Sequence, residues 1–499
     1  MNFSLASIRA RGRKKSHVSG AACSKAYMPC FILVVFQLVA CGGSSTSSSG
    51  TSGRDVSSTL VTEGCNPVVS HSIDREMLEP ASKAYGCVYP LEIQDHAATM
   101  QLLSDGTLFV GASSGGVYRS FDQGKSWEYI EIPPLENGDS NSGSHGIVHV
   151  DPRTDRLYYL TSTQVPSCAT TNPQPTDFLS VLRGSVLSWS DDAGNTWEGA
   201  TIACDTYDWG KVATGPAPQG NAYPSAIYVF GVAERLIGGK RYVDRSLDGG
   251  VTWERMANIA SATTEAGSAV AGPDGTIYFE YPEYNGYDPA RVLDQTYPYK
   301  PENACKMMVA ISEDYGETWR QEAVPGTLAC FLGTGTQKVA IDNAGAAYLI
   351  WVSDVDGQLY MNTSVDRGHT WTSAVNIMPP EATFSSSHVT IAAAESGHIL
   401  IAGMLGKSAT NGRVGVVHHT GQWYSFLMES FNASAEKPFF DSVNLDSDDD
   451  PSVIEGESMT EMNGYTALTP SGEGWAVFVR HSGGTFSEGN LVVSRIVRP

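Results

Sequence analysis

The sequence lacks a long apolar run near its N-terminus, where the hydrophobic stretch is short. That stretch, FILVVFQLV from Phe31 to Val39, is too short to span a bilayer stably. Six Lys and Arg residues and no acidic residue precede it, which is typical of a secretory signal. We therefore expect residues 1–40 to be a signal peptide that takes no part in the fold.

Basic residues are also scarce, with 32 Lys and Arg against 54 Asp and Glu. Removal of residues 1–40 would leave 26 of those 32 basic residues and all 54 acidic ones, a net charge of −28. Such a surface repels nucleic acid and anionic lipid headgroups. We expect no nucleic-acid partner and no membrane contact except through an anchor, and solvation alone accounts for the charge.

No C-x-x-C pair occurs, which argues against a zinc site or a thioredoxin-like motif. An even number of Cys follows residue 41, which suggests disulfides in a chain outside the cytoplasm. These residues are Cys65, Cys87, Cys168, Cys204, Cys305 and Cys330.

The apolar run ends in Leu38-Val39-Ala40-Cys41, which resembles a bacterial lipobox. In that motif cleavage precedes the Cys, and the thiol is lipidated; the alternative is cleavage elsewhere, with Cys41 incidental. Residues 41–57 are rich in Gly and Ser and predict a flexible tether to a domain over residues 58–499. Gly rather than Asp follows the Cys, which resembles the enterobacterial rule for outer-membrane sorting. We expect an exported chain that is lipid-anchored in the outer membrane.

An octet with the pattern S-x-D-x-G-x-[ST]-W occurs five times, starting at Ser120, Ser190, Ser246, Ser312 and Ser364. Its Asp and Ser suit hydrogen bonds to amides of their own turn, its Gly allows a positive φ, and its Trp covers the turn. We therefore expect structural rather than catalytic aspartates. They are Asp122, Asp192, Asp248, Asp314 and Asp366.

Each octet lies between two strand-like runs, with two more upstream, so one unit has four strands, A to D, and the octet joins C to D. Octet starts lie 52 to 70 residues apart, so most units carry insertions. The pattern predicts an all-β fold, a β-propeller of seven four-stranded blades, with six as the alternative. Inner A strands are expected near residues 97, 146, 211, 266, 337, 388 and 464. The last unit lacks a fourth strand, which we expect residues 58–70 to supply.

Two long insertions join B to C in the second and fourth units and therefore lie on the face opposite the octets. Cys168 and Cys305 lie in these insertions, and Cys204 and Cys330 follow the D strands of the same units. We therefore predict the sequential pairs Cys65–Cys87, Cys168–Cys204 and Cys305–Cys330.

The octets resemble the bacterial neuraminidase repeat, or Asp box, of the sialidase superfamily. SDDAGNTW and SLDGGVTW match that repeat residue for residue. Sortilin ectodomains, photosystem II assembly factors and xyloglucan-cleaving hydrolases also carry it, so the resemblance implies a propeller but no single activity.

Sialidase chemistry, which the resemblance would imply, uses three arginines on a carboxylate, a Tyr nucleophile with a Glu partner, and an Asp acid/base. The family's [FY]-R-I-P motif is not recognisable, because the corresponding region reads YPLEIQDHAATMQLL. Arg119 adjoins an octet, on the wrong face, and Arg245, Arg291 and Arg480 match no motif. The arginine triad is therefore not recognisable either.

Four residues near the starts of A strands are candidates for proton transfer or metal binding at the channel mouth: His96, His145, Glu265 and His388. The alternative is that they cap strand ends. Five tyrosines of the fourth unit offer stacking surfaces for a sugar or polymer, or simply pack within their loop. They are Tyr281, Tyr284, Tyr287, Tyr297 and Tyr299.

The segment LDSDDDPSVIEGE spaces four carboxylates as a calcium loop does: Asp446, Asp448, Asp450 and Glu457. Pro451 stands where that loop needs Gly, and a solvated acidic loop is the alternative. Calcium is thus the one cofactor we consider, and none is required.

The sequence favours a lipid-anchored propeller that binds a glycan or a protein on the face opposite the octets. The alternatives are a sialidase-like glycoside hydrolase with a diverged site, and an assembly or scaffold factor of the cell envelope. Oligomeric state is left open.

Overall fold

A computed structural model divides the chain into two units, residues 1–59 and 60–499. Only parts of the second unit are described. These are residues 65–78, 84–95, 97–141, 143–170, 183–204, 210–233, 240–260, 268–283, 305–329, 338–353, 355–386, 388–407, 421–446, 452–454, 465–469, 472–480 and 489–498.

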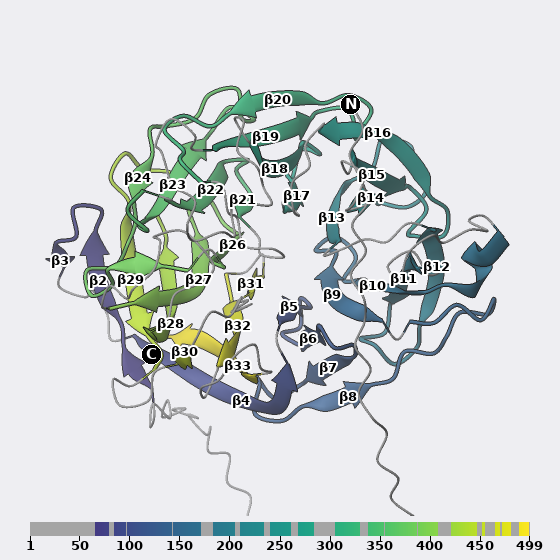
Figure 1. Cartoon of the computed structure of the whole chain (residues 1–499), viewed down its shortest axis with the longest axis horizontal. Coiled ribbons are helices and arrows are strands. Elements are labelled where there is room, and N and C mark those ends of the chain that lie inside the picture. The colour runs from purple at the N-terminus through teal and green to yellow at the C-terminus, as the bar shows by residue number, and fades with distance from the viewer. Residues whose placement is uncertain are drawn as a thin grey trace, which may run out of the picture. The chain divides into compact units, whose positions relative to one another are not determined.

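The described strands form seven antiparallel sheets arranged around a common centre (Figure 1). This confirms the predicted all-β propeller, and the number of sheets equals the larger of the two blade counts considered. The one described helix is the 3-10 turn η1, Pro166–Thr170. Within the described ranges, no helix is long and apolar enough to cross a membrane.

The first three sheets follow one another along the chain, each with four strands. Sheet one contains β5 (Ala98–Leu102), β6 (Leu108–Ala112), β7 (Val117–Ser120) and β8 (Glu128–Ile130). Sheet two contains β9 (Ser144–Val150), β10 (Leu157–Gln164), β11 (Arg183–Ser190) and β12 (Glu198–Ala203). Sheet three contains β13 (Lys211–Pro216), β14 (Ser225–Ala233), β15 (Lys240–Ser246) and β16 (Glu254–Ala260).

Sheets four and five repeat this order. Sheet four contains β17 (Ala269–Ala271), β18 (Ile277–Glu283), β19 (Lys306–Ser312) and β20 (Arg320–Ala323). Sheet five contains β21 (Val339–Ile341), β22 (Ala347–Val352), β23 (Leu359–Ser364) and β24 (Val375–Asn376).

The last two sheets recruit strands from the N-terminal side. Sheet six contains β26 (Thr390–Ala393), β27 (Ile399–Gly406), β28 (Gly421–Ser430) and β29 (Phe439–Asn444), joined by β25 (Phe384–Ser385), β30 (Ser452–Ile454), β2 (Val69–Ser72) and β3 (Met77–Leu78). Sheet seven contains β31 (Tyr465–Leu468), β32 (Gly474–Arg480), β33 (Gly489–Val497), β4 (Tyr85–Asp95) and β1 (Asn66–Pro67).

The strands nearest the centre are β5, β9, β13, β17, β21, β26 and β31, and each contacts the next around the ring (Figure 1). Their positions match the seven predicted A strands. The apolar core lies between neighbouring sheets: Met100 and Val110 of sheet one, for example, pack with Trp475 and Val477 of sheet seven. Strands such as β6, buried at every position, are therefore apolar throughout.

Ring closure differs from the prediction. The strand that completes sheet seven is β4, which pairs with β33 from Tyr85↔Val497 to Asp95↔Gly489, and not a strand from residues 58–70. Of that earlier segment, β1 pairs with β4 and β2 pairs with β29 of sheet six. The eleven-residue β4 can form a longer ladder with β33 than the short β1 or β2 could. β1 therefore lies outside β4 in sheet seven, and β2 lies outside β29 in sheet six.

The ring has two distinct faces because successive strands are antiparallel. On the octet face lie the connections from the first to the second strand and from the third to the fourth. All five octets connect third and fourth strands, in sheets one to five. The remaining connections lie on the opposite face, here called the loop face.

Two of the three predicted disulfides are confirmed, Cys65–Cys87 and Cys168–Cys204. Cys305 is also disulfide-bonded, and its predicted partner Cys330 lies outside the described residues. Cys168 and Cys204 follow β10 and β12, so their bond lies on the loop face.

Candidate functional site

In the octets, the Ser, Asp and Thr side chains form hydrogen bonds within their own turns. In each, the Asp accepts hydrogen bonds from the first Ser and from the backbone N–H and hydroxyl of the seventh residue, as in Ser190 and Thr196 to Asp192 at 2.6 to 2.8 Å. The first Ser hydroxyl accepts the N–H of the octet glycine, Gly194 in this case, at 2.8 Å. In four of the five octets the Trp indole donates to that glycine's carbonyl.

These hydrogen bonds favour the ionised carboxylate. The bonds from the seventh residue lower the pKa of Asp122, Asp192 and Asp366 to about 2. The octet aspartates are thus ionised at neutral pH and surrounded by donors of their own turn. Such a group suits turn formation rather than proton transfer.

The residue before each octet glycine also has a positive φ, which the sequence analysis did not expect. The values are 60° at Gln123, 57° at Ala193, 80° at Gly249, 61° at Tyr315 and 60° at Arg367. A left-handed residue there is uncommon for a side chain larger than Gly. Contacts from outside the octet must therefore help to hold this residue in its left-handed conformation.

Arginines from the preceding sheet supply part of that restraint, because each donates to the carbonyl of this fourth octet residue. The pairs are Arg119 with Ala193, Arg156 with Gly249, Arg245 with Tyr315, and Arg320 with Arg367. Arg119 also pairs with Glu128, and Arg245 with Glu254 and Glu317. These arginines join neighbouring sheets on the octet face.

The loop face presents different chemistry where the inner strands begin. Lys211 is the first residue of β13, Lys338 directly precedes β21, and His388 lies two residues before β26. All three side chains are buried. Each is followed by a Val. A basic side chain thus recurs at the same position in three sheets, where the inner strand begins.

Lys211 reaches a sheet that is not its neighbour. Its Nζ lies 3.4 Å from the hydroxyl of Tyr465 and 5.9 Å from the centre of that ring. Lys211 belongs to sheet three and Tyr465 to sheet seven. This contact therefore joins two non-adjacent sheets across the centre of the ring.

Lys338 belongs to a hydrogen-bonded network between sheets four and five. Its N–H donates to the Ser268 hydroxyl at 2.9 Å, and that hydroxyl donates to Glu280 at 2.8 Å. The Ser268 N–H also donates to Glu280, at 2.6 Å. The Lys338 ammonium donates to the carbonyl of Val389, in the residues before β26, at 2.5 Å.

Burial sets the charge states of this cluster. It raises the pKa of Glu280, which is 0% exposed, to about 7 against the lowering effect of Ser268. It also lowers the pKa of Lys338 well below its ordinary value; the nearby Glu280 opposes this shift, and repulsion from Lys211 adds to it. Two lysines from different sheets are thus close enough to interact, and Glu280 supplies a countercharge to Lys338 when it is ionised.

Of the four sequence candidates at the channel mouth, His388 is the one whose side chain the structure describes. Burial, aided by Lys338, lowers its pKa to about 3, so it is neutral at neutral pH and a weak general base. His96 and Glu265 lie outside the described residues. His145 lies on β9, but its side chain is outside the described part of the chain.

Of the five candidate tyrosines of the fourth unit, Tyr281 is the one that the structure describes. Its ring is buried beside Phe279, and its hydroxyl donates to Gln321 at 2.8 Å. It therefore packs within sheet four and offers no open stacking face. Tyr284, Tyr287, Tyr297 and Tyr299 lie outside the described residues.

The expected calcium loop is described at Asp446 alone. Its carboxylate pairs with Arg480 and accepts the Ser425 N–H at 2.5 Å. Asp448, Asp450 and Glu457 lie outside the described residues. Among residues the structure does describe, no group of three His, Cys, Asp or Glu is arranged to hold a metal ion.

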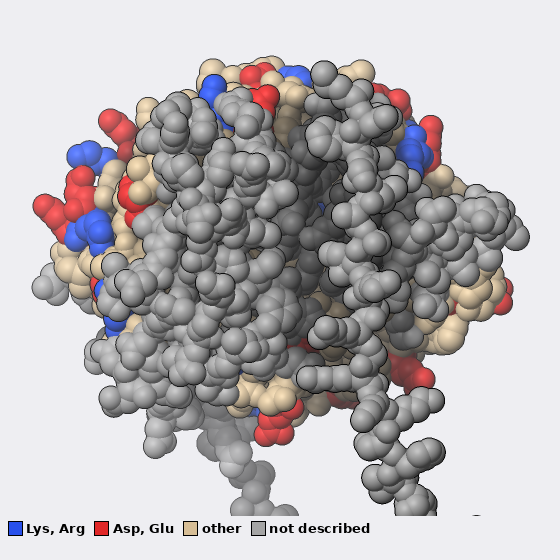
Figure 2. Space-filling view, viewed as in Figure 1, with Lys and Arg blue, Asp and Glu red and all other residues tan. Residues whose placement is uncertain are grey.

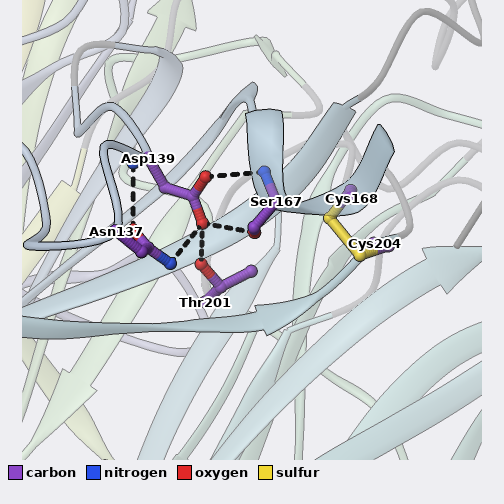
Figure 3. The surroundings of a disulfide bond; sticks show 6 residues. All are labelled: Asn137, Asp139, Ser167, Cys168, Thr201 and Cys204. Carbon is purple, nitrogen blue, oxygen red and sulfur yellow. Dashed lines mark hydrogen bonds between the residues drawn. A yellow bond between two sulfur atoms is a disulfide. The ribbon is translucent and has the colours of Figure 1, made fainter. Parts of the chain in front are cut away.

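A buried carboxylate holds the loop-face segment beside the Cys168–Cys204 disulfide (Figure 3). Asp139, between β8 and β9, accepts the N–H and hydroxyl of Ser167 at 3.0 and 2.6 Å, the Thr201 hydroxyl at 2.5 Å and the Asn137 amide at 2.8 Å. Burial alone would raise the pKa of Asp139, but these hydrogen bonds outweigh it and the pKa lies below its ordinary value. Asp139 therefore clamps sheet one to the insertion of sheet two.

Acidic and basic side chains are interspersed around the visible rim (Figure 2). Ion pairs between such side chains include Arg156 with Asp191, at 2.5 Å. Some of the acidic side chains are thus paired with basic ones.

Sequence reasoning missed Lys211, Lys338 and Glu280. The first two had a readable signal, because a Lys followed by Val opens the runs KVATG and KVAID, at the position where His388 precedes Val389. Glu280 interrupts the apolar run IYFEY. A further turn was also missed: between β28 and β29, Asn432 accepts hydrogen bonds from Ser430 and Phe439. Its segment, SFNASAEK, keeps the first Ser of the octet and has Asn in place of the Asp, but it lacks the Gly, the second Ser or Thr, and the Trp.

No family model matches the chain, and no curated protein matches it. Solved structures do. A polysaccharide lyase, Uly1, is 12% identical over 87% of this chain and 98% of its own, with a TM-score of 0.44. YCF48 bound to D1 peptide is 11% identical over 83% and 96%, with a TM-score of 0.43. The Hadza microbial sialidase Hz136 is 14% identical over 79% and 73%, with a TM-score of 0.42. At these values the likeness carries no argument about function.

Proposed function

We propose that this protein is an exported lipoprotein whose Asp-box propeller, of the sialidase-superfamily type, binds an acidic glycan at the channel mouth of its loop face. The observation that carries the proposal is the pair of buried lysines, Lys211 and Lys338, at the starts of inner strands. A carboxylate or sulfate placed there would add to the countercharge that Glu280 supplies to Lys338 when it is ionised.

The contrast between the faces supports this position for the ligand. On the octet face, hydroxyls, carboxylates and arginines are engaged in turns and sheet contacts. On the loop face, the Cys168–Cys204 bond and Asp139 hold an insertion against its sheet. Held loops around a charged centre suit recognition, because less conformational entropy is lost on binding.

The proposal is tested by calorimetric titration of the full-length protein with sialyl, glucuronyl and galacturonyl oligosaccharides. Lys211→Gln should weaken binding of the acidic ligand by about 10- to 150-fold, since charge-assisted hydrogen bonds contribute roughly 1.5–3 kcal/mol. The matched control is Lys125→Gln, an exposed lysine within an octet, which should bind as the parent does.

Two results count against the proposal. One is that no acidic oligosaccharide of the panel binds. The other is that Lys211→Gln binds the acidic ligand as tightly as Lys125→Gln. Binding of a protein instead of a glycan would replace the proposal with the alternative partner.

A glycoside hydrolase with a diverged site is the second candidate, favoured by Glu280. A carboxyl group whose pKa is about 7 is protonated in about half of the molecules at neutral pH, which allows it to act as a general acid. Hydrolysis of a fluorogenic sialoside or an acidic polysaccharide, abolished by Glu280→Gln, would support it. Lack of turnover by the parent rejects it without affecting the binding proposal.

The lipid anchor is proposed at Cys41, with residues 1–40 removed and residues 41–57 as the tether. Labelling cells with an alkyne fatty acid should mark the parent and Cys30→Ser equally and leave Cys41→Ser unlabelled. Fractionation of the labelled membranes then tests the outer-membrane placement.

A further inference from the structure

A second concave site lies on the loop face between sheets one and two. It is a cavity of about 410 Å³, within the roughly 300–1,000 Å³ typical of ligand pockets. Its walls come from the β6–β7 turn, from the segment after β8, and from Tyr159 of β10. We call it the Tyr129 cavity after its most exposed aromatic residue.

The β6–β7 wall is held tightly. Ser114 donates its N–H and its hydroxyl to Asp95 of β4, at 3.0 and 2.6 Å. Gly116 donates its N–H to the Tyr159 hydroxyl at 2.9 Å. Gly116 has a φ of 114°, and a Cβ there would lie 2.7 Å from the Tyr129 ring. This wall therefore needs Gly to bring Tyr129 against the backbone.

The opposite wall includes Ile132 and Asn141, and the Asp139 clamp of Figure 3 holds the segment between them. Asn141, two residues from Asp139, donates its amide to the carbonyl of Pro133. That bond orients the amide, and within the described part of the chain its Oδ1 is buried without a hydrogen-bond partner. An unpaired buried acceptor is uncommon in folded proteins.

The lining combines two kinds of surface. Tyr129 is 61% exposed and meets Tyr118 edge-on, with ring centres 5.4 Å apart. Hydroxyl and amide groups come from Ser114, Asn141 and Tyr159, and none of the lining residues is charged. A sugar ring has an apolar C–H face for an aromatic ring and hydroxyls for such polar groups, whereas an anion would gain no countercharge here.

We propose that the Tyr129 cavity is a binding site for a neutral sugar residue. One ring face would lie on Tyr129, and the sugar hydroxyls would face the polar groups that Ser114, Asn141 and Tyr159 contribute to the lining. This site is separate from the channel mouth and does not rest on the acidic-glycan proposal.

The test is titration of the full-length protein with maltose, cellobiose, lactose and methyl α-mannoside, with calorimetry as the readout. Tyr129→Ala should weaken binding of the neutral sugar at least 10-fold, while Tyr129→Phe, which keeps the ring, should stay within about 2-fold. The matched control is Phe121→Ala, which removes an equally exposed aromatic residue (63%) from the octet face. Lys211→Gln should leave neutral-sugar binding unchanged.

The proposal is overturned if none of these sugars binds, or if Tyr129→Ala binds as Phe121→Ala does. Because Tyr129 is largely exposed, circular dichroism and thermal melting of its variants should match those of the parent. Loss of acidic-glycan binding in Lys211→Gln with neutral-sugar binding intact would show that the two sites fail independently.

Discussion

The aspartates of the octet face and the lysines of the loop face form contacts at different ranges along the chain. Asp192, on the octet face, takes its hydrogen bonds from residues two to four positions away. Lys211, on the loop face, contacts Tyr465, 254 positions away. Local bonds build turns and leave little capacity for a ligand, whereas distant contacts gather charged groups at one place.

The largest expected effect tests whether the loop face depends on its covalent restraint. Replacing both Cys168 and Cys204 by Ala should lower the free energy of unfolding by about 3 kcal/mol, because the bond closes a loop of 36 residues. Urea denaturation measures it. Glu198→Ala, an exposed position on β12, should stay within about 0.5 kcal/mol. Equal stability of the two variants would show that the Asp139 clamp holds the insertion unaided.

The second-largest expected effect is a change in stability with pH, which differs in direction between the two faces. Glu280 has a folded pKa of about 7 against an ordinary value of 4.5, so the folded state binds more protons between these values. Stability should therefore fall as pH rises from 4.5 to 7, on the order of 2–3 kcal/mol from this group. Glu280→Gln should remove that fall in urea titrations at pH 5 and pH 8.

The control for this measurement is Glu283→Gln, an exposed residue on the same strand, which should keep the parent's pH dependence. The octet aspartates act in the opposite direction. With folded pKa values of about 2 at Asp122 and Asp192, their contribution is lost only as pH falls below about 4. A Glu280→Gln variant that keeps the parent's pH dependence would contradict the Glu280 assignment.

The smallest effect compares two neighbouring acids of one octet. Asp192→Ala should cost about 1–2 kcal/mol, because it removes the acceptor of several turn hydrogen bonds. Asp191→Ala removes an exposed ion pair with Arg156 and should cost about 0–1 kcal/mol. Thermal unfolding distinguishes them, and equal losses would mean that the turn does not depend on its Asp.

Several features could be predicted because their signals lie close together in the sequence. The octets, their place between third and fourth strands, and the inner strands beginning near Lys211 or Tyr465 were predicted in this way. Two disulfides followed once the topology placed Cys168 and Cys204 on one face. Closure was wrong, because the residues before β5 contain several strand-like segments, and pairing length with β33 favoured β4.

The candidate site was predictable only in location. His388 marked the channel mouth, but Lys338 and Glu280 become a cluster only when sheets four and five bring them together. Arg119 and Arg245 matched no sequence motif, because their partners are carbonyl groups of the next octet. A backbone carbonyl has no signature in a sequence.

By itself, the sequence determined the turns and the fold class, since an octet's hydrogen bonds close within a few residues and recur five times. Only the tertiary structure decided which strand closes the ring, which lysines meet across the channel, and where the Tyr129 cavity forms. Those contacts join residues far apart in the chain, and their geometry depends on how neighbouring sheets pack.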